Sequence, residues 1–156
     1  MRFLIAQENP GISYGGQKND HGYDIIHCSD DGYLLGGTTK SFGHGSSDML
    51  AIKLDRFANV EWMKTYGWPH HDVCRSIVEV ADGYIIMGDA WDYGQSLLDM
   101  FIVKTDFSGN LLWHHYYGTG AQDFGFDIKA IDQGDLLLLG YTRGVDPAGD
   151  LILVRI

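Results

Sequence analysis

The stretch "DMLAIKLDRFANVEWMKTYG" (Asp48–Gly67) is followed, 51 residues later, by "DMFIVKTDFSGNLLWHHYYG" (Asp99–Gly118). A third, partial copy follows, in which Asp150 lies another 51 residues after Asp99. Tandem copies of this length are typical of repeat proteins, whose units must stack on their neighbours to bury their apolar faces. The fold therefore depends on what a single copy forms.

The copies contain short apolar runs of strand length, rich in Ile, Val, Tyr and Trp and bounded by Gly, Asp and Asn. Such runs are typical of β-strands joined by tight turns, and no window shows the period of a long amphipathic helix. In order of position within a copy, the expected strands are Tyr23–Ser29, Ser76–Val80 and Phe126–Ile131; Tyr33–Thr38, Tyr84–Asp89 and Leu136–Tyr141; Met49–Leu54, Met100–Thr105 and Leu151–Ile156; and Val60–Tyr66 and Leu111–Tyr117.

Four antiparallel strands in about 50 residues, repeated along the chain, predict an all-β protein built of β-propeller blades. We expect one domain over residues 1–156, with blades at about 15–66, 67–117 and 118–156. The second runs are apolar on both faces and should be central strands, whereas the fourth runs mix polar and aromatic residues as outer strands do. Asp48, Asp99 and Asp150, which open the third strands, should bond local backbone amides.

The stretch "SSDMLAIKLDRFANVEWMKTYG…DGYIIMGDA", which runs from the first copy into the second, resembles the bacterial and archaeal propeller repeats often described as seven-bladed (SBBP-type) repeats. Their units read roughly S-D-x-x-hydrophobic-x-K-x-D-x-x-G-N-x-x-W-x-x-x-Y-G-G and then D-G-x-hydrophobic-x-x-G-x-T. The resemblance covers about residues 14–156. It implies a binding or scaffolding role more than any set chemistry, and relatives of this kind are mostly found in long secreted or surface-attached chains.

The third copy shows three strand runs, and the segment Arg2–Tyr14 ends in the same Tyr-Gly pair that closes the fourth strands. We therefore expect this segment to supply the missing outer strand. Because propellers have about four to eight blades, we expect a homodimer, in which two chains exchange terminal strands and form a six-bladed ring. The alternative is a fragment of a longer blade array.

Composition excludes several classes of function. The formal net charge is −10, with 11 basic residues scattered among 21 acidic ones, which argues against a nucleic-acid partner. No apolar run is long enough for a membrane-spanning helix. Cys28 and Cys74 are too few for a disulfide framework or zinc cluster and are expected in the core. No cofactor or metal motif is present, and without a recognisable signal peptide we expect a cytoplasmic protein or a piece of a larger one.

The candidate site lies on the face where the loops between strands two and three and the loops between blades emerge. These loops differ between copies while the strands repeat, and variable loops on a rigid scaffold are where binding residues usually lie. Their aromatic, His and Asp side chains suit a glycan (carbohydrate) or a polypeptide ligand. The candidate ligand-binding residues are Phe42, His44, Trp68, His70, His71, Trp91, Asp92, Tyr93 and Asp146.

Three functions remain open from the sequence. The first is a non-catalytic propeller module that self-associates and presents this loop face to a glycan or polypeptide. The second is a glycan-directed hydrolase or lyase that uses loop Asp and His residues, with Asp89 and Asp92 as a carboxylate pair. The third is a purely structural array, in which Trp68 and Trp91 simply pack between adjacent blades.

Overall fold

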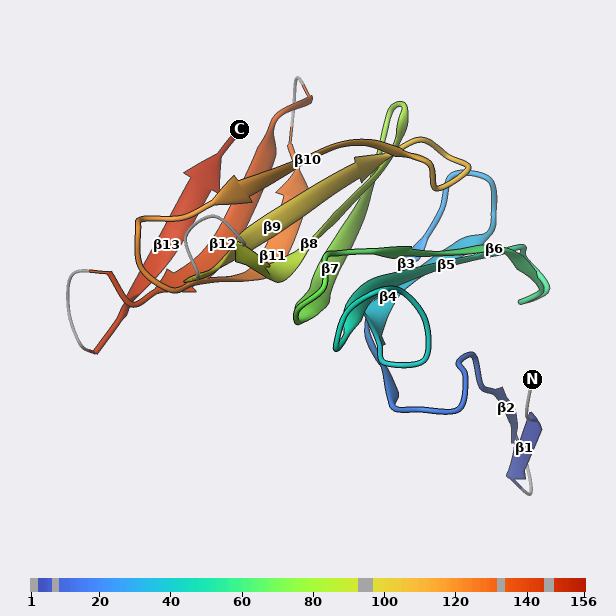
Figure 1. Cartoon of the computed structure of the whole chain (residues 1–156). Helices are drawn as coiled ribbons and strands as arrows, with labels where there is room; N and C mark the ends of the chain where they lie inside the picture. Colours follow the sequence, from blue (N-terminus) through green and yellow to red (C-terminus); the bar gives the residue numbers. More distant parts are fainter. Residues whose placement is uncertain (1–2, 7–8, 93–96, 132–133, 145–147) are drawn as a thin grey trace.

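The chain is all-β in the computed structural model, which describes residues 3–6, 9–92, 97–131, 134–144 and 148–156 (Figure 1). Three antiparallel sheets follow one another, each built from strands that are consecutive in the sequence. Sheet 1 contains β3 (Asp20–His27), β4 (Tyr33–Thr39), β5 (Asp48–Leu54) and β6 (Val60–Tyr66); sheet 2 contains β7 (Asp72–Val80), β8 (Gly83–Asp92), β9 (Leu97–Thr105) and β10 (Leu111–Tyr117); sheet 3 contains β11 (Asp123–Ala130), β12 (Leu136–Thr142) and β13 (Asp150–Arg155). The all-β prediction is confirmed.

The N-terminal segment forms a separate two-stranded hairpin of β1 (Phe3–Ala6) and β2 (Asn9–Ile12). Among the described strands these two pair only with each other, so within one chain the segment does not complete sheet 3. Figure 1 places the hairpin at the sheet 1 end of the array and the C-terminus at the sheet 3 end. Completion of sheet 3 by an N-terminal strand of a second chain stays a prediction.

The first strand of each sheet carries a bulge at the same repeat position. The register shifts between Gly22 and Asp24 in β3, between Cys74 and Ser76 in β7, and in β11 next to Asp127. A bulge interrupts the inward–outward alternation of side chains. This interruption explains why the sequence pattern placed the starts of these strands three or four residues too late.

The first strands lie together at the inner side of the array, while the fourth strands lie outside. Ser76 Oγ in β7 lies 3.1 Å from Asp24 Oδ2 in β3 and 2.9 Å from Asp127 Oδ1 in β11. A single hydroxyl can reach both neighbouring sheets only if the three first strands converge. The sheets therefore fan outward from their first strands, as Figure 1 shows.

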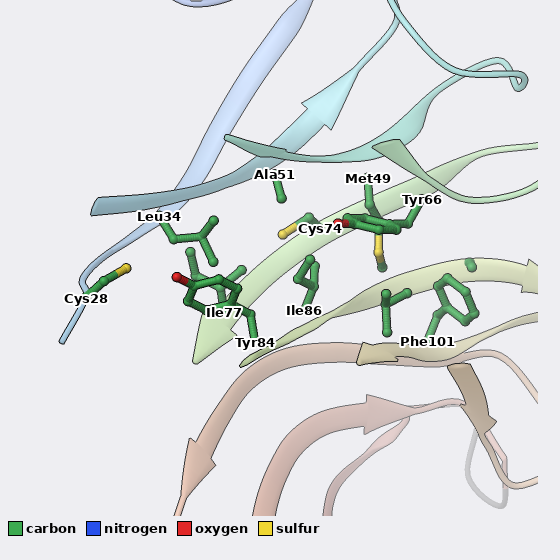
Figure 2. Close-up of a cluster of buried hydrophobic side chains, with 12 residues drawn as sticks. Cys28, Leu34, Met49, Ala51, Tyr66, Cys74, Ile77, Tyr84, Ile86 and Phe101 are labelled. Carbon is green, nitrogen blue, oxygen red and sulfur yellow. The ribbon is translucent and has the colours of Figure 1, made fainter. Parts of the chain in front are cut away.

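Apolar side chains fill the two junctions between sheets. Junction 1, between sheets 1 and 2, buries one cluster, part of which Figure 2 shows. It includes Cys28 and Cys74, which confirms both as core residues. Junction 2, between sheets 2 and 3, buries a second cluster that includes Ile102 and Leu138. Burying this much apolar surface supplies most of the drive to stack the sheets.

The repeated polar landmarks stabilise turns. Asp55 Oδ1 accepts hydrogen bonds from the amides of Phe57 and Asn59 in the β5–β6 turn, and Asp106 makes the equivalent bonds in the β9–β10 turn. Asp48 Oδ2 accepts the amide of Gly45, as expected for an Asp that opens a third strand. Turn chemistry of this kind fixes where each hairpin reverses.

A candidate ligand groove between the first two sheets

A mainly apolar hollow follows the outer side of junction 1, between β6 and the strands β9 and β10. It has a volume of about 600 Å³ and runs from the loop face to the β9–β10 turn. We call it the junction groove; its lining residues are His44, Lys64, Thr65, Tyr66, Gly67, Trp68, Pro69, Phe101, Val103, Gly109, Asn110, Leu111 and His114. The volume is within the range of pockets that bind small molecules or anchor side chains.

A repeated loop places Trp68 at the mouth of the groove. Gly67 has a φ of 149°, which favours glycine, and the next amide, of Trp68, donates to Asp72 Oδ2 at 2.6 Å. A side chain at Gly67 would collide with Asp72. The loops before sheets 1 and 3 repeat this bond, from Gly16 to Asp20 and from Thr119 to Asp123.

Asp72 is fully buried beneath this loop. Burial raises its pKa to about 6, with the amide of Trp68 acting against the rise and the nearby Asp48 adding to it. A buried carboxyl held by a backbone amide makes the loop geometry specific, so the position of Trp68 depends on a group below the surface.

Aromatic rings form the wall of the groove. Trp68 meets His114 edge-on with ring centroids 5.5 Å apart, and His114 lies 5.6 Å from Phe101. Burial, together with the neighbouring His115, lowers the pKa of His114. At neutral pH the wall is therefore uncharged, and such a surface favours flat or apolar ligand groups.

Polar side chains also line the groove, and some of them are held by neighbouring groups. Lys64 is exposed and lies close enough to Asp106 that its charge, after the hydrogen bonds from Asn110 and Ser108, helps to lower the pKa of that carboxyl. Asn110 is also held by the turn, because its Nδ2 donates to Asp106 Oδ2 at 2.9 Å. The groove thus combines a large apolar wall with the cationic head of Lys64.

The structure brings together the predicted site residues that lie at junction 1. His44 and Trp68 line the groove, the rings of His70 and Trp91 are 6.2 Å apart, and His71 Nδ1 lies 3.2 Å from Ser47 Oγ.

Other predicted residues lie apart from this group or cannot be placed. Phe42 lies beside Gly16 at the start of sheet 1, away from the groove. The side chain of Asp92, together with Tyr93 and Asp146, lies outside the described residues.

Sequence reasoning missed the groove residues that belong to strands. Tyr66, Phe101 and His114 lie on strands, whereas the sequence analysis assigns ligand binding to the variable loops. The signal that could have found them is the density of aromatic residues in the fourth runs, "VEWMKTY" and "LLWHHYY".

The carboxylate pair considered for catalysis is partly explained by structure. Asp89 is buried, lies 3.2 Å from Arg75 and accepts the amide of Gly125 at 2.7 Å. Burial raises its pKa, while Arg75 and that amide oppose the rise. All its described contacts connect strands, so Asp89 links sheets 2 and 3.

Comparison with known proteins adds no assignment: no family model matches the chain, and no curated protein matches it. Within the described residues no group of three or more His, Cys, Asp or Glu side chains is placed to hold a metal ion. No helix in that part of the chain is both long and apolar enough to cross a bilayer.

Proposed function

We propose that the chain is a non-catalytic β-propeller module of the SBBP-like kind that binds a polypeptide in the junction groove. Each sheet is one blade, with the first strand inside and the fourth strand outside. The observation that carries the proposal is the groove itself, an apolar hollow of about 600 Å³ walled by Trp68, Phe101 and His114. A groove of this size is wide enough to take an apolar or aromatic side chain of an extended peptide.

A polypeptide fits the groove better than a glycan does. Sugar recognition needs several polar side chains directed at hydroxyl groups, whereas Tyr66 and Asn110 of the lining already donate to Gly109 and Asp106, and much of the wall is aromatic or aliphatic. Burying an apolar anchor beside Trp68 would supply most of the affinity, and Lys64 would favour an acidic residue next to the anchor. Glycan binding is therefore the alternative outcome of the test below.

The two other functions have weaker support. A glycan-directed hydrolase or lyase would need accessible carboxylates, and Asp89 is buried against Arg75. In a purely structural array the groove would have no role. Closely packed interfaces rarely keep an unfilled hollow of this size, so the groove favours a binding function.

Self-association belongs to the same proposal. We expect two copies to join by exchange of terminal strands into a six-bladed ring, because an array of three blades leaves a bare face at each end. The simplest measurement is solution mass, for which we expect twice the chain mass of 17.4 kDa.

The binding test uses a panel of short peptides with a central Phe, Trp or Leu flanked by Glu or by Lys, and a panel of soluble oligosaccharides. We expect peptides with an apolar anchor and Glu flanks to bind, and Trp68→Ala to weaken them about 10-fold or more. Trp113→Ala is the matched control, because Trp113 has similar exposure and lies outside the groove-lining set.

Trp68 is 43% exposed, so its replacement should leave the melting temperature unchanged. The proposal is wrong if no peptide binds, or if Trp68→Ala and Trp113→Ala weaken binding equally. Selective oligosaccharide binding that depends on Trp68 would favour the glycan alternative instead.

A further inference from the structure

Apolar residues on the outer face of sheet 3 are far more exposed than their counterparts inside the junctions. On the face that looks toward the following sheet, Met49 and Met100 are 0% exposed, whereas their counterpart Leu151 is 74% exposed. One step along the same strand, Ile102 is 0% exposed and its counterpart Leu153 is 62% exposed. The register of β12 with β13 repeats that of β8 with β9, so these residues share a position and differ only in what covers them.

At the opposite end of the array the first strand of sheet 1 shows the complementary pattern, while Leu50, Ile52 and Leu54 of β5 on the same face are already buried against residues that include Tyr14 and Leu35. On the face that looks toward the preceding sheet, Ile77 and Ile128 are 3% and 1% exposed, while Ile25 in β3 is 61% exposed. A methyl group added at Gly22 would point into open space, whereas one added at Gly125 would lie 3.2 Å from Met87 across junction 2. The first strand of sheet 1 therefore presents the surface that packs against a preceding sheet, and sheet 3 presents the surface that packs against a following sheet.

A tyrosine hydrogen bond shows where a preceding fourth strand would end. Tyr66, the last residue of β6, donates its hydroxyl to Gly109 O in the turn of the next sheet at 2.8 Å. Tyr14 makes the same bond to Ala58 O, the equivalent turn residue of sheet 1, at 2.7 Å. Tyr14 thus occupies the place of the final residue of a fourth strand, and β2 precedes it as the rest of β6 precedes Tyr66.

We infer that sheet 3 of one copy docks on sheet 1 of a second copy, and that β2 of the second copy pairs with the free edge of β13. This inference rests on the self-association part of the proposed function and names its surfaces and register. Among the described strands β13 pairs only with β12, so its outer edge can accept a strand. By the register of β5 with β6, Leu151 would face Tyr14 and Leu153 would face Ile12 of the second copy.

Two such junctions close a ring of two copies and six blades, whereas three copies would give nine blades, outside the usual range. The exposed leucines of sheet 3 would be covered as Met100 and Ile102 are covered in junction 2. Asp127 would approach Asp24 of the second copy, and Lys129, 2.9 Å from Asp127, is placed to offset their repulsion.

The experiment combines solution mass with a designed cross-link between copies. Leu139 and Gly22 occupy the same repeat positions as Met87 and Gly125, which meet across junction 2. We therefore expect Leu139→Cys combined with Gly22→Cys to oxidise to a covalent dimer. Native Cys28 and Cys74 are buried and should not compete.

Two controls bracket this result. Met87→Cys with Gly125→Cys is the matched control inside one chain and shows whether a disulfide can bridge these two repeat positions, because a side chain at Gly125 meets the terminal methyl of Met87 at 3.2 Å and the Gly88 carbonyl at 2.8 Å. Leu139→Cys with Met63→Cys is the negative control, because Met63 lies on the outer strand β6. Separately, Leu153→Asp should weaken association at least about 30-fold while leaving the circular dichroism spectrum of the chain unchanged.

Each outcome decides between distinct alternatives. A monomer that forms the internal cross-link but not the intermolecular one overturns both the self-association and this junction. Twice the chain mass without the Leu139–Gly22 cross-link overturns the junction and leaves self-association standing. A ladder of higher multimers overturns the closed ring of two copies. Peptide binding that depends on Trp68 is independent of all three outcomes.

Discussion

Junction 2 and the outer face of sheet 3 present nearly the same side chains in opposite environments. Ile102 and Met100 lie in a dry interface, while Leu153 and Leu151 occupy the same positions and face solvent. The residues are apolar at both places because they share a repeat position. They differ in burial because a neighbouring sheet covers only the residues of junction 2. The exposed leucines of sheet 3 are the surface on which the proposed second copy would dock.

The charged residues show the same contrast. Lys53 is buried, with its Nζ 2.7 Å from Asp30 Oδ2, and Lys104 is buried beside Asp82. At the open end the pair is repeated as Arg155 and Asp135, but there the Arg155 side chain is 63% exposed. Ion pairs gain strength when neighbouring groups exclude water, so this pair should contribute little until something covers sheet 3.

The sharpest test of this contrast replaces equivalent residues of the two regions. Ile102→Ala should lower the free energy of unfolding by about 2–5 kcal/mol because it leaves a cavity in junction 2. Leu153→Ala should cost less than about 0.5 kcal/mol in the isolated chain. Urea unfolding at a concentration where the chain is monomeric measures both. Equal losses of stability would contradict the difference in burial between the two positions.

A second test compares the titration of Asp72 and Asp20, which hold the same repeat position. Burial raises the pKa of Asp72 to about 6. Burial also acts to raise the pKa of Asp20, but hydrogen bonds from Thr39, Gly16 and Ser41 outweigh it and leave the pKa below its ordinary value.

The signs of the two contributions are therefore opposite. Asp72 stabilises the fold when protonated, and this contribution is lost as pH rises through about 6; Asp20 stabilises the fold when ionised, and its contribution is lost as pH falls below about 4. In the unmodified protein, the raised pKa of Asp72 should lower the free energy of unfolding by about 1–3 kcal/mol as pH rises from about 4 to 7. Asp72→Asn should abolish this decrease. Asp20→Asn should instead flatten the acid limb, and unfolding measured across this pH range shows whether the two variants act on different limbs as expected.

The tyrosine bonds offer a smaller effect. Tyr66→Phe leaves the carbonyl of Gly109 without its donor inside junction 1 and should cost about 1–2 kcal/mol. Tyr14→Phe breaks the same bond at the open end, where water can replace the hydroxyl, and should cost under about 0.5 kcal/mol in the monomer. A larger loss for Tyr14 than for Tyr66 in thermal unfolding would contradict this ranking.

The smallest expected change is at the turn that receives Tyr14. Ala58 has a φ of 65° where Gly109, its counterpart, has 73°, so Ala58 carries backbone strain that glycine would avoid. Ala58→Gly should raise stability by about 0.5–1 kcal/mol, measured by the same unfolding assay. Gly109→Ala is the reciprocal control and should destabilise, because its new methyl group would meet the ring of Trp62.

The spacing of 51 residues was enough to predict the sheets and most strand bounds. Val60–Tyr66 and Leu111–Tyr117 were predicted to the residue, because Gly and Asn mark both ends of each run. The bulges were not predicted, since a bulge is a backbone feature that leaves composition unchanged.

The sequence places some of the candidate residues beside the groove, and their role in binding stays a prediction. The loop position of Trp68 and His44 could be seen in the sequence, but the groove could not. It forms where Phe101 and His114 of sheet 2 meet the loop after sheet 1, and that contact depends on how two sheets stack. The alternation of side chains predicts which face of a strand a residue lies on. It does not predict the space left between two stacked sheets.

The short turn between β7 and β8 has a consequence for how the chain folds. Val80 pairs with Gly83, so adjacent strands meet soon after synthesis and each hairpin can form before the next repeat leaves the ribosome. Repeats with similar sequences can pair with strands of the wrong unit. A short turn lets each strand pair with its native neighbour before a competing strand is available. Lengthening this connection should therefore lower the yield of correctly refolded protein more than its equilibrium stability.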